Sequence, residues 1–260
     1  MTTAQRVFIT GASSGIGQAL ARHYAGQGAV LGLVARRGLL LESLIAGLPG
    51  GAERHMAIIA DVADAEAMRQ AGEAFIARAG LPDIVIANAG ISVGTLTDEP
   101  EDAVAFEAVL KTNVFGMFAT FQPFVVPMRA RGSGRLVGIS SVAGVRGLPG
   151  AGAYSASKAA ASRYLESLRV EMVGSGVKVV DIRPGYIATP MTAINPYPMP
   201  FLLQPDEAAR RFARAIAAGA SQATIPWQMG IVARVLAMLP NWLHTALFAR
   251  AKRKPRGLSL

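Results

Sequence analysis

Tyr154 and Lys158 lie four residues apart in the sequence, and Ser141 precedes the tyrosine by thirteen residues. Residues four apart share one face of a helix, so the two side chains can reach the same place. A phenol is a weak acid with a pKa of about 10. An ammonium group one turn away favours the phenolate and brings that pKa toward the working range. These residues predict proton transfer at a carbonyl or alcohol oxygen, coupled to hydride transfer at the attached carbon.

A glycine-rich stretch follows the first apolar run of the chain and reads Thr10-Gly-Ala-Ser-Ser-Gly-Ile-Gly17. Gly11 permits a tight turn, Gly15 lets the backbone approach a pyrophosphate, and Gly17 lets the next helix pack closely. The amino end of that helix would offer free N–H groups to the phosphates. The predicted contacts are Gly11, Ser13, Ser14, Gly15, Ile16 and Gly17. A glycine turn without a ligand is the alternative interpretation.

The same stretch also contains the Gly-x-Ser-x-Gly pattern of a hydrolase nucleophile, with Ser13 at its centre. That mechanism needs an acid and a histidine downstream. Histidines occur only at positions 23, 55 and 244, and His244 lies in an apolar segment without an obvious orienting acid. A serine hydrolase is therefore kept as an alternative hypothesis.

Two arginines occupy the position that decides which dinucleotide is bound. An NAD site expects an acidic residue near the end of the second strand, where it binds the ribose 2′-hydroxyl. Here the chain has Arg36 and Arg37 instead. Because a guanidinium group matches a phosphate in charge and geometry, we expect NADP(H) rather than NAD(H). The alternative is that both arginines are solvated in a loop.

Apolar runs and helical patterns alternate along the chain. Strands are predicted at residues 6–10, 29–35, 56–60, 83–87, 134–140 and 177–182, and helices at 15–27, 102–121, 154–173 and 205–218. Asp64 is expected to cap a further helix. This alternation predicts the α/β class, with a doubly wound, Rossmann-type parallel sheet covered by helices on both faces. A single domain over residues 1–260 is expected.

Composition narrows the function classes. The chain has no cysteine, which rules out disulfides and thiol catalysis and fits the reducing cytoplasm. Residues 1–6 do not read as a signal peptide, and the three histidines form no metal-binding cluster. The net charge is +9, but the basic residues are scattered rather than clustered, so no nucleic-acid partner is expected.

Together these residues resemble the short-chain dehydrogenase/reductase family, over roughly residues 5 to 190. The glycine stretch, Ser141, Tyr154 and Lys158 match family motifs in order and spacing. The other matching motifs are Asp61-Val62, Asn88-Ala89-Gly90, Asn113 and Arg183-Pro184-Gly185. The resemblance implies an NADP(H)-dependent oxidoreductase that interconverts a ketone or aldehyde with an alcohol. It also implies a homo-oligomer.

The resemblance implies a role for each matched residue. Tyr154 would be the general acid in reduction, and Ser141, rather than Ser140, would hold the substrate oxygen. Lys158 would lower the pKa of the tyrosine and bind the nicotinamide ribose, and Asn113 would hold a water that links Lys158 to solvent. The remaining implied cofactor contacts are Asp61 and Val62 at the adenine, Asn88, Ala89 and Gly90 beneath the cofactor, and Pro184, Gly185, Ile187 and Thr189 near the carboxamide. A turn serine at 141 and a solvent-facing asparagine at 113 are the alternatives.

Two segments outside these motifs bear on substrate and partners. Residues 190–205 contain alternating prolines and large apolar side chains, which predicts a substrate loop and a bulky apolar substrate. The alternative is that this loop simply packs on the edge of the sheet. Residues 226–260 form an apolar and basic extension, without a clear strand at 223–226. Its apolar part predicts self-association, with a substrate lid or contact to a membrane surface as the alternatives. Its basic end, Arg250 to Arg256, is expected to be a solvated tail or to lie on an anionic membrane.

Three function classes therefore stay open: a carbonyl reductase or alcohol dehydrogenase, a nucleotide-binding sensor or scaffold without turnover, and the Ser13 hydrolase. The combination of Ser141, Tyr154, Lys158 and Asn113 favours the first, because a sensor has no need of a proton donor.

Overall fold

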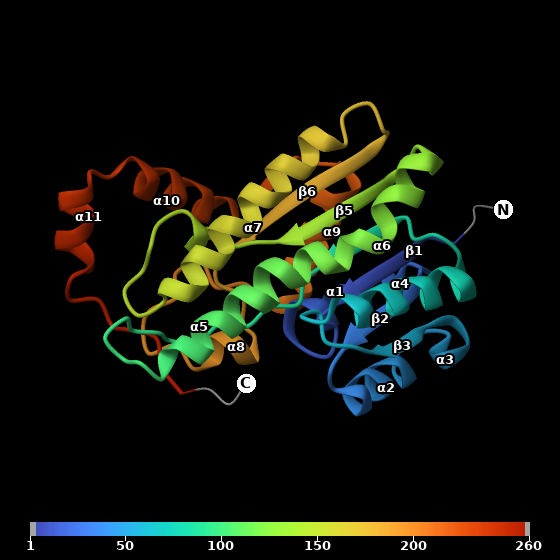
Figure 1. Ribbon diagram of the computed structural model, residues 1–260, viewed down its shortest axis with the longest axis horizontal. Helices are drawn as coiled ribbons and strands as arrows, with labels where there is room; N and C mark the ends of the chain where they lie inside the picture. The colour runs from blue at the N-terminus through green and yellow to red at the C-terminus, as the bar shows by residue number, and fades with distance from the viewer. Residues whose placement is uncertain (1–3, 258–260) are drawn as a thin grey trace.

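Seven parallel strands form one sheet with helices on both faces in the computed structural model, which describes residues 4–257 (Figure 1). The strands are β1 (Arg6–Thr10), β2 (Val30–Ala35), β3 (Met56–Ile59), β4 (Ile84–Ala87), β5 (Gly134–Ile139), β6 (Val177–Pro184) and β7 (Gln222–Ile225). Their order in the sheet is β3-β2-β1-β4-β5-β6-β7. The predicted doubly wound α/β fold is confirmed. The order reverses between β1 and β4, and the crevice at such a point is where open α/β sheets bind ligands.

The helices divide between the two faces because each has one apolar stripe to bury. One face carries α1 (Gly15–Gly26), α2 (Gly38–Ala46) and α9 (Pro205–Ala217), and the other carries α4 (Ala65–Ala79), α6 (Gly116–Arg131) and α7 (Gly152–Glu171). The remaining elements are α3 (Gly51–Arg54), α5 (Asp102–Leu110), the π-helical turn η1 (Lys111–Phe115), the 3-10 turn η2 (Val142–Gly144), α8 (Pro190–Ala193), α10 (Trp227–Met238) and α11 (Asn241–Phe248).

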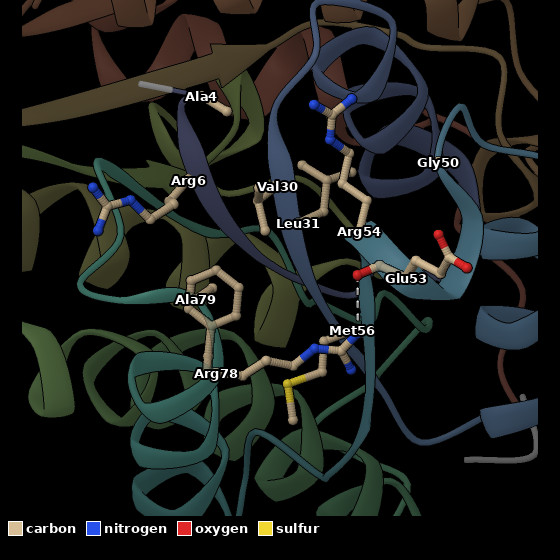
Figure 2. A pocket seen from close by; sticks show the side chains of 11 residues that line it. Ala4, Arg6, Val30, Leu31, Gly50, Glu53, Arg54, Met56, Arg78 and Ala79 are labelled. Atoms are coloured by element: carbon tan, nitrogen blue, oxygen red, sulfur yellow. Dashed lines mark hydrogen bonds between the residues drawn. The ribbon is translucent and has the colours of Figure 1, made fainter. Parts of the chain in front are cut away.

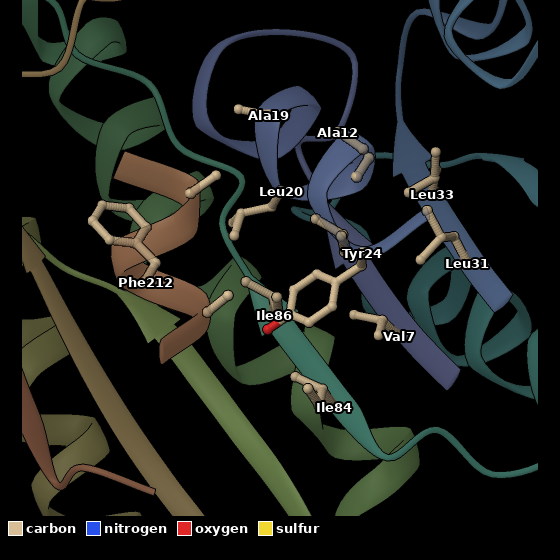
Figure 3. Close-up of a cluster of buried hydrophobic side chains, with 14 of the residues drawn as sticks. Val7, Ala12, Ala19, Leu20, Tyr24, Leu31, Leu33, Ile84, Ile86 and Phe212 are labelled. Atoms are coloured by element: carbon tan, nitrogen blue, oxygen red, sulfur yellow. The ribbon is translucent and has the colours of Figure 1, made fainter. Parts of the chain in front are cut away.

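Alternate residues of each strand supply the two halves of the core. Val7 of β1 and Ile86 of β4 face α1 and α9, where they join Leu20, Tyr24 and Phe212 (Figure 3). On the opposite face, the ring of Phe8 packs on those of Phe75 and Phe124, with centroids 5.6 and 4.8 Å away. Burial of both faces explains why the strands read as continuous apolar runs.

A local capping residue determines where α4 starts, whereas packing against the sheet determines how far α6 extends. Asp64 accepts hydrogen bonds from the backbone N–H groups of Glu66 and Ala67, as predicted for a cap. The helix predicted to end near residue 121 instead continues to residue 131, through two prolines. A proline inside a helix costs about 3 kcal/mol. Phe121, Phe124 and Met128 are fully buried on this helix, and their burial offsets that cost.

The expectation that residues 223–226 form no clear strand was wrong. Residues 222–225 form β7, which pairs in parallel with β6 from Asp181 to Pro184. A four-residue strand at a sheet edge has too little pattern to recognise, since only its pairing with β6 defines it.

Within the described residues, one continuous helical segment, Asp102–Arg131, is long and apolar enough to cross a membrane. The pair α10 and α11 would qualify only as a span bent by 119°. On the first segment, Phe121, Phe124 and Met128 lie in the core, whereas Phe106, Phe118 and Val126 are exposed.

Candidate active site

A cavity of about 600 Å³ lies at the carboxyl ends of the central strands, at the point between β1 and β4 where the strand order reverses. Every predicted site residue lines it except Gly17 and Asn113. The fold therefore brings together residues that are separated in the sequence by as much as 178 positions, from Gly11 to Thr189.

A second hollow, of about 700 Å³, lies at the opposite ends of the strands (Figure 2). Its rim carries Arg6, Arg54 and Arg78, and Arg78 donates a hydrogen bond to the carbonyl of Ala52 at 2.6 Å. None of the predicted site residues lines this hollow. We assign the functional site to the cavity at the carboxyl ends, where parallel sheets bind ligands.

The turn between β1 and α1 is built around glycines. Gly11 has a φ of 66°, and a Cβ atom there would lie 2.7 Å from the Cα of Ala89. A Cβ atom on Gly17 would lie 2.3 Å from the carbonyl oxygen of Gly11. Gly17 therefore acts beneath the cavity, by letting α1 pack against the turn, which explains why it does not line the cavity itself.

The amino end of α1 is suited to an anion. Ser14 precedes the helix without a side-chain cap, and the first turn carries no acidic residue, so the N–H groups face the cavity uncapped. The guanidinium of Arg37 donates hydrogen bonds to the hydroxyls of Ser13 and Ser14, at 2.8 and 3.0 Å. Arg36 lies 3.7 Å from the carboxylate of Asp61. These groups fit the phosphates of a dinucleotide, with positive charge where its adenosine ribose would lie.

Asn88 ties the end of β4 to the glycine turn. Its amide nitrogen donates hydrogen bonds to the carbonyl oxygens of Thr10 and Gly11, at 3.0 and 3.2 Å. The hydroxyl of Thr10 in turn accepts from the backbone N–H groups of Asn88 and Ala89. The Asn-Ala-Gly stretch thus holds the floor of the cavity rigid.

Tyr154, Lys158 and Ser141 meet on one side of the cavity. The Nζ atom of Lys158 lies 5.7 Å from the ring centroid of Tyr154 and donates a hydrogen bond to the carbonyl of Ile139 at 2.8 Å. Burial lowers the pKa of Lys158 to about 8, and the charge of Asp181 opposes this shift. Burial raises the pKa of Tyr154, while a hydrogen bond with Ser141 opposes the rise, so the net lowering expected from Lys158 is not found.

The two adjacent serines have separate roles. The hydroxyl of Ser140 is buried and donates to the carboxylate of Asp181 and, more weakly, to the carbonyl of Ile182. The hydroxyl of Ser141 accepts from the N–H of Ala143 at 3.1 Å and bonds with Tyr154. Ser141 is therefore the serine that accompanies the tyrosine.

Asn113 is a buried clamp rather than a solvent-facing residue. It is 1% exposed, in the π-helical turn η1. Its Oδ1 accepts from the N–H of Ile91 at 2.8 Å, and its Nδ2 donates to the carbonyl of Ile91 and the hydroxyl of Ser157, at 3.0 and 2.9 Å. Since both amide hydrogens are used, a water in a proton relay could bind this side chain only by donating to Oδ1.

The predicted substrate loop covers part of the cavity. Met191, Thr192 and Ile194, in and after α8, line it. Tyr197 lies farther out, with its ring 6.5 Å from that of Tyr186. An isolated bridge between Ile187 and Leu203 closes the base of the loop.

The basic end of the chain corrects one expectation. Neither a solvated tail nor a membrane-bound one describes Lys254, which is 8% exposed and donates a hydrogen bond to the hydroxyl of Ser92 at 2.8 Å. Arg256 pairs with Asp102 at 2.8 Å. Sequence reasoning missed Ser92 and Lys254 because a run of basic residues gives no sign that one of them is buried.

The geometry disfavours the hydrolase. Ser13 accepts a hydrogen bond from Arg37, and in the described part of the chain no histidine lines the cavity. His55 instead bonds with the carbonyl of Pro49, and His244 stacks on Phe248. Among residues 4–257, no group of three or more metal-ligating side chains is close enough together to hold an ion.

Comparisons with known proteins agree with this geometry. A family model described as short chain dehydrogenase matches residues 5–196. An uncharacterized oxidoreductase from Myxococcus xanthus is 38% identical over 244 residues, which are 94% of this chain and 96% of the relative. A crystal structure of a short-chain dehydrogenase from Streptomyces avermitilis has a TM-score of 0.79 and 28% identity, and covers 94% of this chain and 98% of that chain. An alcohol dehydrogenase from Thermococcus sibiricus, complexed with 5-hydroxy-NADP, has a TM-score of 0.75 and 27% identity, and covers 85% of this chain and 96% of that chain.

Replacing Asn113 with alanine tests its role as a clamp. The substitution leaves the partly buried N–H and C=O groups of Ile91 without these partners, so we expect the free energy of unfolding to fall by about 2–4 kcal/mol. Urea denaturation measures this change. Asn241→Ala is the matched control, because Asn241 is exposed and accepts one hydrogen bond, from Arg146. Equal stability of the two variants would contradict the clamp.

Proposed function

We propose that this chain, which belongs to the short-chain dehydrogenase family, is an NADP(H)-dependent oxidoreductase that interconverts a ketone or aldehyde with an alcohol. The observation that carries the proposal is the convergence of Ser141, Tyr154 and Lys158 on the cavity that the glycine turn closes at its other end. The proton donor and the phosphate-binding groups thereby share one space.

The bound nicotinamide would supply or accept the hydride at the substrate carbon. The residues of the chain would handle the proton and the developing charge. Ser141 and Tyr154 would hold the substrate oxygen between their hydroxyls, and Tyr154 would give that oxygen its proton during reduction. Burial raises the pKa of Tyr154, so at neutral pH the phenol keeps the proton that a general acid must donate.

Lys158 would stabilise the phenolate that remains after the proton has moved. Its ammonium is fixed by the carbonyl of Ile139 and faces the ring of Tyr154. With a pKa of about 8, it is mostly charged at neutral pH. Above that pH the ammonium loses its proton and the phenolate loses its counter-charge. Reduction should therefore slow as the pH rises through about 8.

NADP(H) is favoured over NAD(H) by the charges beside the glycine turn. Arg36 and Arg37 line the cavity after β2, and Arg37 reaches the hydroxyls of Ser13 and Ser14. A 2′-phosphate at this place would receive a charge-assisted hydrogen bond. The related alcohol dehydrogenase complexed with 5-hydroxy-NADP is in keeping with this preference.

A bulky, apolar carbonyl compound is the proposed substrate. Ile91 and Val93 from the loop after β4, together with Met191 and Ile194 from the substrate loop, line the cavity. Their side chains would surround the body of the substrate while its oxygen meets Tyr154.

A nucleotide-binding sensor without turnover is the rival from another class. It would also be stabilised by NADPH, so ligand-induced stabilisation alone does not separate the two. Carbonyl-dependent loss of NADPH absorbance does, because only the enzyme consumes the cofactor.

Tyr154→Phe tests the proton donor. Loss of the hydroxyl should lower kcat for carbonyl reduction by about 10²–10⁴-fold, because the general acid is gone. NADPH binding, followed by cofactor fluorescence, should persist. Tyr164→Phe is the control: it is on the same helix, stacked on Phe121 and outside the cavity, and its activity should equal that of the wild type. If Tyr154→Phe also equals the wild type, the mechanism is wrong.

Arg37→Met tests the cofactor preference. The variant loses the positive charge beside Ser13, so its affinity for NADPH should fall by about tenfold to hundredfold while its affinity for NADH stays the same. Fluorescence titration with each cofactor measures both. Arg129→Met, at the far end of α6, should change neither. Equal losses for the two cofactors would argue against a 2′-phosphate contact.

We also propose that the chain self-associates through α10 and α11. Both helices leave large apolar side chains exposed, which in monomeric proteins is uncommon over so continuous a surface. These residues are Trp227, Ile231, Val235, Met238, Trp242 and Leu247.

Trp242→Glu should convert the oligomer to monomers in sedimentation velocity, because it places a charge in the apolar contact. Leu39→Glu is the control, since Leu39 is 82% exposed on α2 and its substitution should leave the oligomer intact. A monomeric wild type that pellets with anionic vesicles would show that the surface binds lipid instead.

A further inference from the structure

The last described residues of the chain, 251–257, pack against the loop that leads from β4 to α5; we call them the C-terminal tail (Figure 1). The N–H of Gly94 donates a hydrogen bond to the carbonyl of Pro255 at 2.8 Å. A Cβ atom on Gly94 would lie 2.3 Å from the carbonyl oxygen of Lys254. On the other side, a Cβ atom on Gly150 would lie 2.8 Å from that of Arg253. The tail therefore fits between two loops that border the active site.

Arg256 anchors the tail through charge. Its Nε atom lies 2.8 Å from the carboxylate of Asp102, and another of its nitrogens lies 3.1 Å from that of Glu99. Asp102 also accepts the N–H of Leu96 at 2.8 Å. The hydrogen bond from Arg256 is the largest cause that lowers the pKa of Asp102. The tail is thus attached to the start of α5 by groups that are ionised at neutral pH.

The anchored tail places Lys254 beside the proposed proton donor. The Nζ atom of Lys254 lies 5.8 Å from the ring centroid of Tyr154, nearly the same distance as that of Lys158. The hydroxyl that it contacts, on Ser92, belongs to a residue that lines the active-site cavity. Lys254 therefore approaches Tyr154 from the side of the loop after β4, whereas Lys158 approaches from within α7.

Lys254 is buried without a compensating charge. An ammonium group has three donors, and here one of them is used, by the hydroxyl of Ser92. Among residues 4–257 no carboxylate pairs with it, and burial alone lowers the pKa of Lys254 to about 8. A buried ammonium is costly unless an anion or further acceptors surround it. An anionic group bound in the cavity beside Ser92 would supply the balancing charge.

We propose that Lys254 is a specificity residue that binds an anionic group on the substrate, and that the substrate is an oxo acid with an apolar body. This inference rests on the proposed function, because it assumes that the substrate carbonyl is bound at Tyr154. The carboxylate would accept hydrogen bonds from Lys254 and from the hydroxyl of Ser92. The apolar chain would lie against Ile91, Val93 and the substrate loop.

Paired substrates test the proposal. Oxodecanoates with the ketone at different positions, each matched with its methyl ester, are reduced by the wild type, Lys254→Met and Lys252→Met. The wild type should prefer at least one acid over its ester in kcat/KM. In Lys254→Met that preference should fall by about tenfold to hundredfold, mainly through a higher KM for the acid, because a charged hydrogen bond is lost. Lys252→Met, an exposed charge on the same tail, should keep the preference.

Two further variants separate recognition from folding. Lys254→Arg retains the charge and should restore part of the acid preference. Arg256→Gln frees the tail and should reduce the preference as Lys254→Met does. NADPH should stabilise every variant against heat, which shows that the nucleotide site is folded.

Other outcomes overturn the inference. If the wild type reduces neutral ketones but no acid better than its ester, Lys254 does not select an anion, although the proposed function stands. If Lys254→Met lowers kcat equally for acid and ester, the residue acts on Tyr154 or on the fold. If no carbonyl compound is reduced, the proposed function fails. Calorimetric titration of the enzyme–NADP⁺ complex with decanoate then tests whether Lys254 binds a carboxylate. Decanoate should bind the wild type and not Lys254→Met.

Discussion

The hydrogen bond from Lys158 to the carbonyl of Ile139 is the contact on which the geometry of the site depends. It joins α7 to the end of β5, and on each of these two segments a further site residue lies close to the bonded residue. Ser141 follows Ile139 by two residues, and Tyr154 precedes Lys158 by one helical turn. This bond therefore helps to set the distance between the serine hydroxyl and the phenol. The hydrogen bond from Asn113 to Ser157 and the packing of Leu165 and Leu168 on the sheet hold the same helix in place.

Holding an ammonium in this place requires charge balance nearby. Lys158 is 4% exposed, and burial of an isolated charge costs several kcal/mol even after relaxation. Asp181 on β6, which is 2% exposed, supplies a negative charge that favours the protonated lysine. That carboxylate is itself satisfied by the hydroxyl of Ser140 and by the guanidinium of Arg183 at 2.8 Å. The charges of Asp181 and Arg183 on β6 and of Lys158 on α7 therefore lie together beneath the site, and Ser140 and the carbonyl of Ile139 bind to them.

The sequence was informative wherever the physics is local. The glycine turn follows from its spacing, the cap at Asp64 from the preference of aspartate for the start of a helix, and the shared face of Tyr154 and Lys158 from helical periodicity. The contact between Lys254 and Ser92 joins residues 162 positions apart, and no local pattern encodes it. The same limit applies to Asn113, whose neighbours say nothing about its bonds to Ile91 and Ser157. The length of α6 was misjudged because burial of its apolar face outweighs its prolines.

The predictable part of the site and the unpredicted part lie in different segments of the chain. The groups that would hold the cofactor and move the proton lie at the ends of β1, β4, β5 and β6, within residues 5–196 that the family model matches. The C-terminal tail lies outside that range and reaches the cavity only through its contacts with the loop after β4. Its ion pair with Glu99 is partly exposed, and such pairs typically contribute about 1 kcal/mol or less, so the tail is anchored mainly by the pair with the buried Asp102. A change in the tail would therefore alter what the cavity admits at little cost to the sheet, since Tyr154 and Lys158 are held by other contacts.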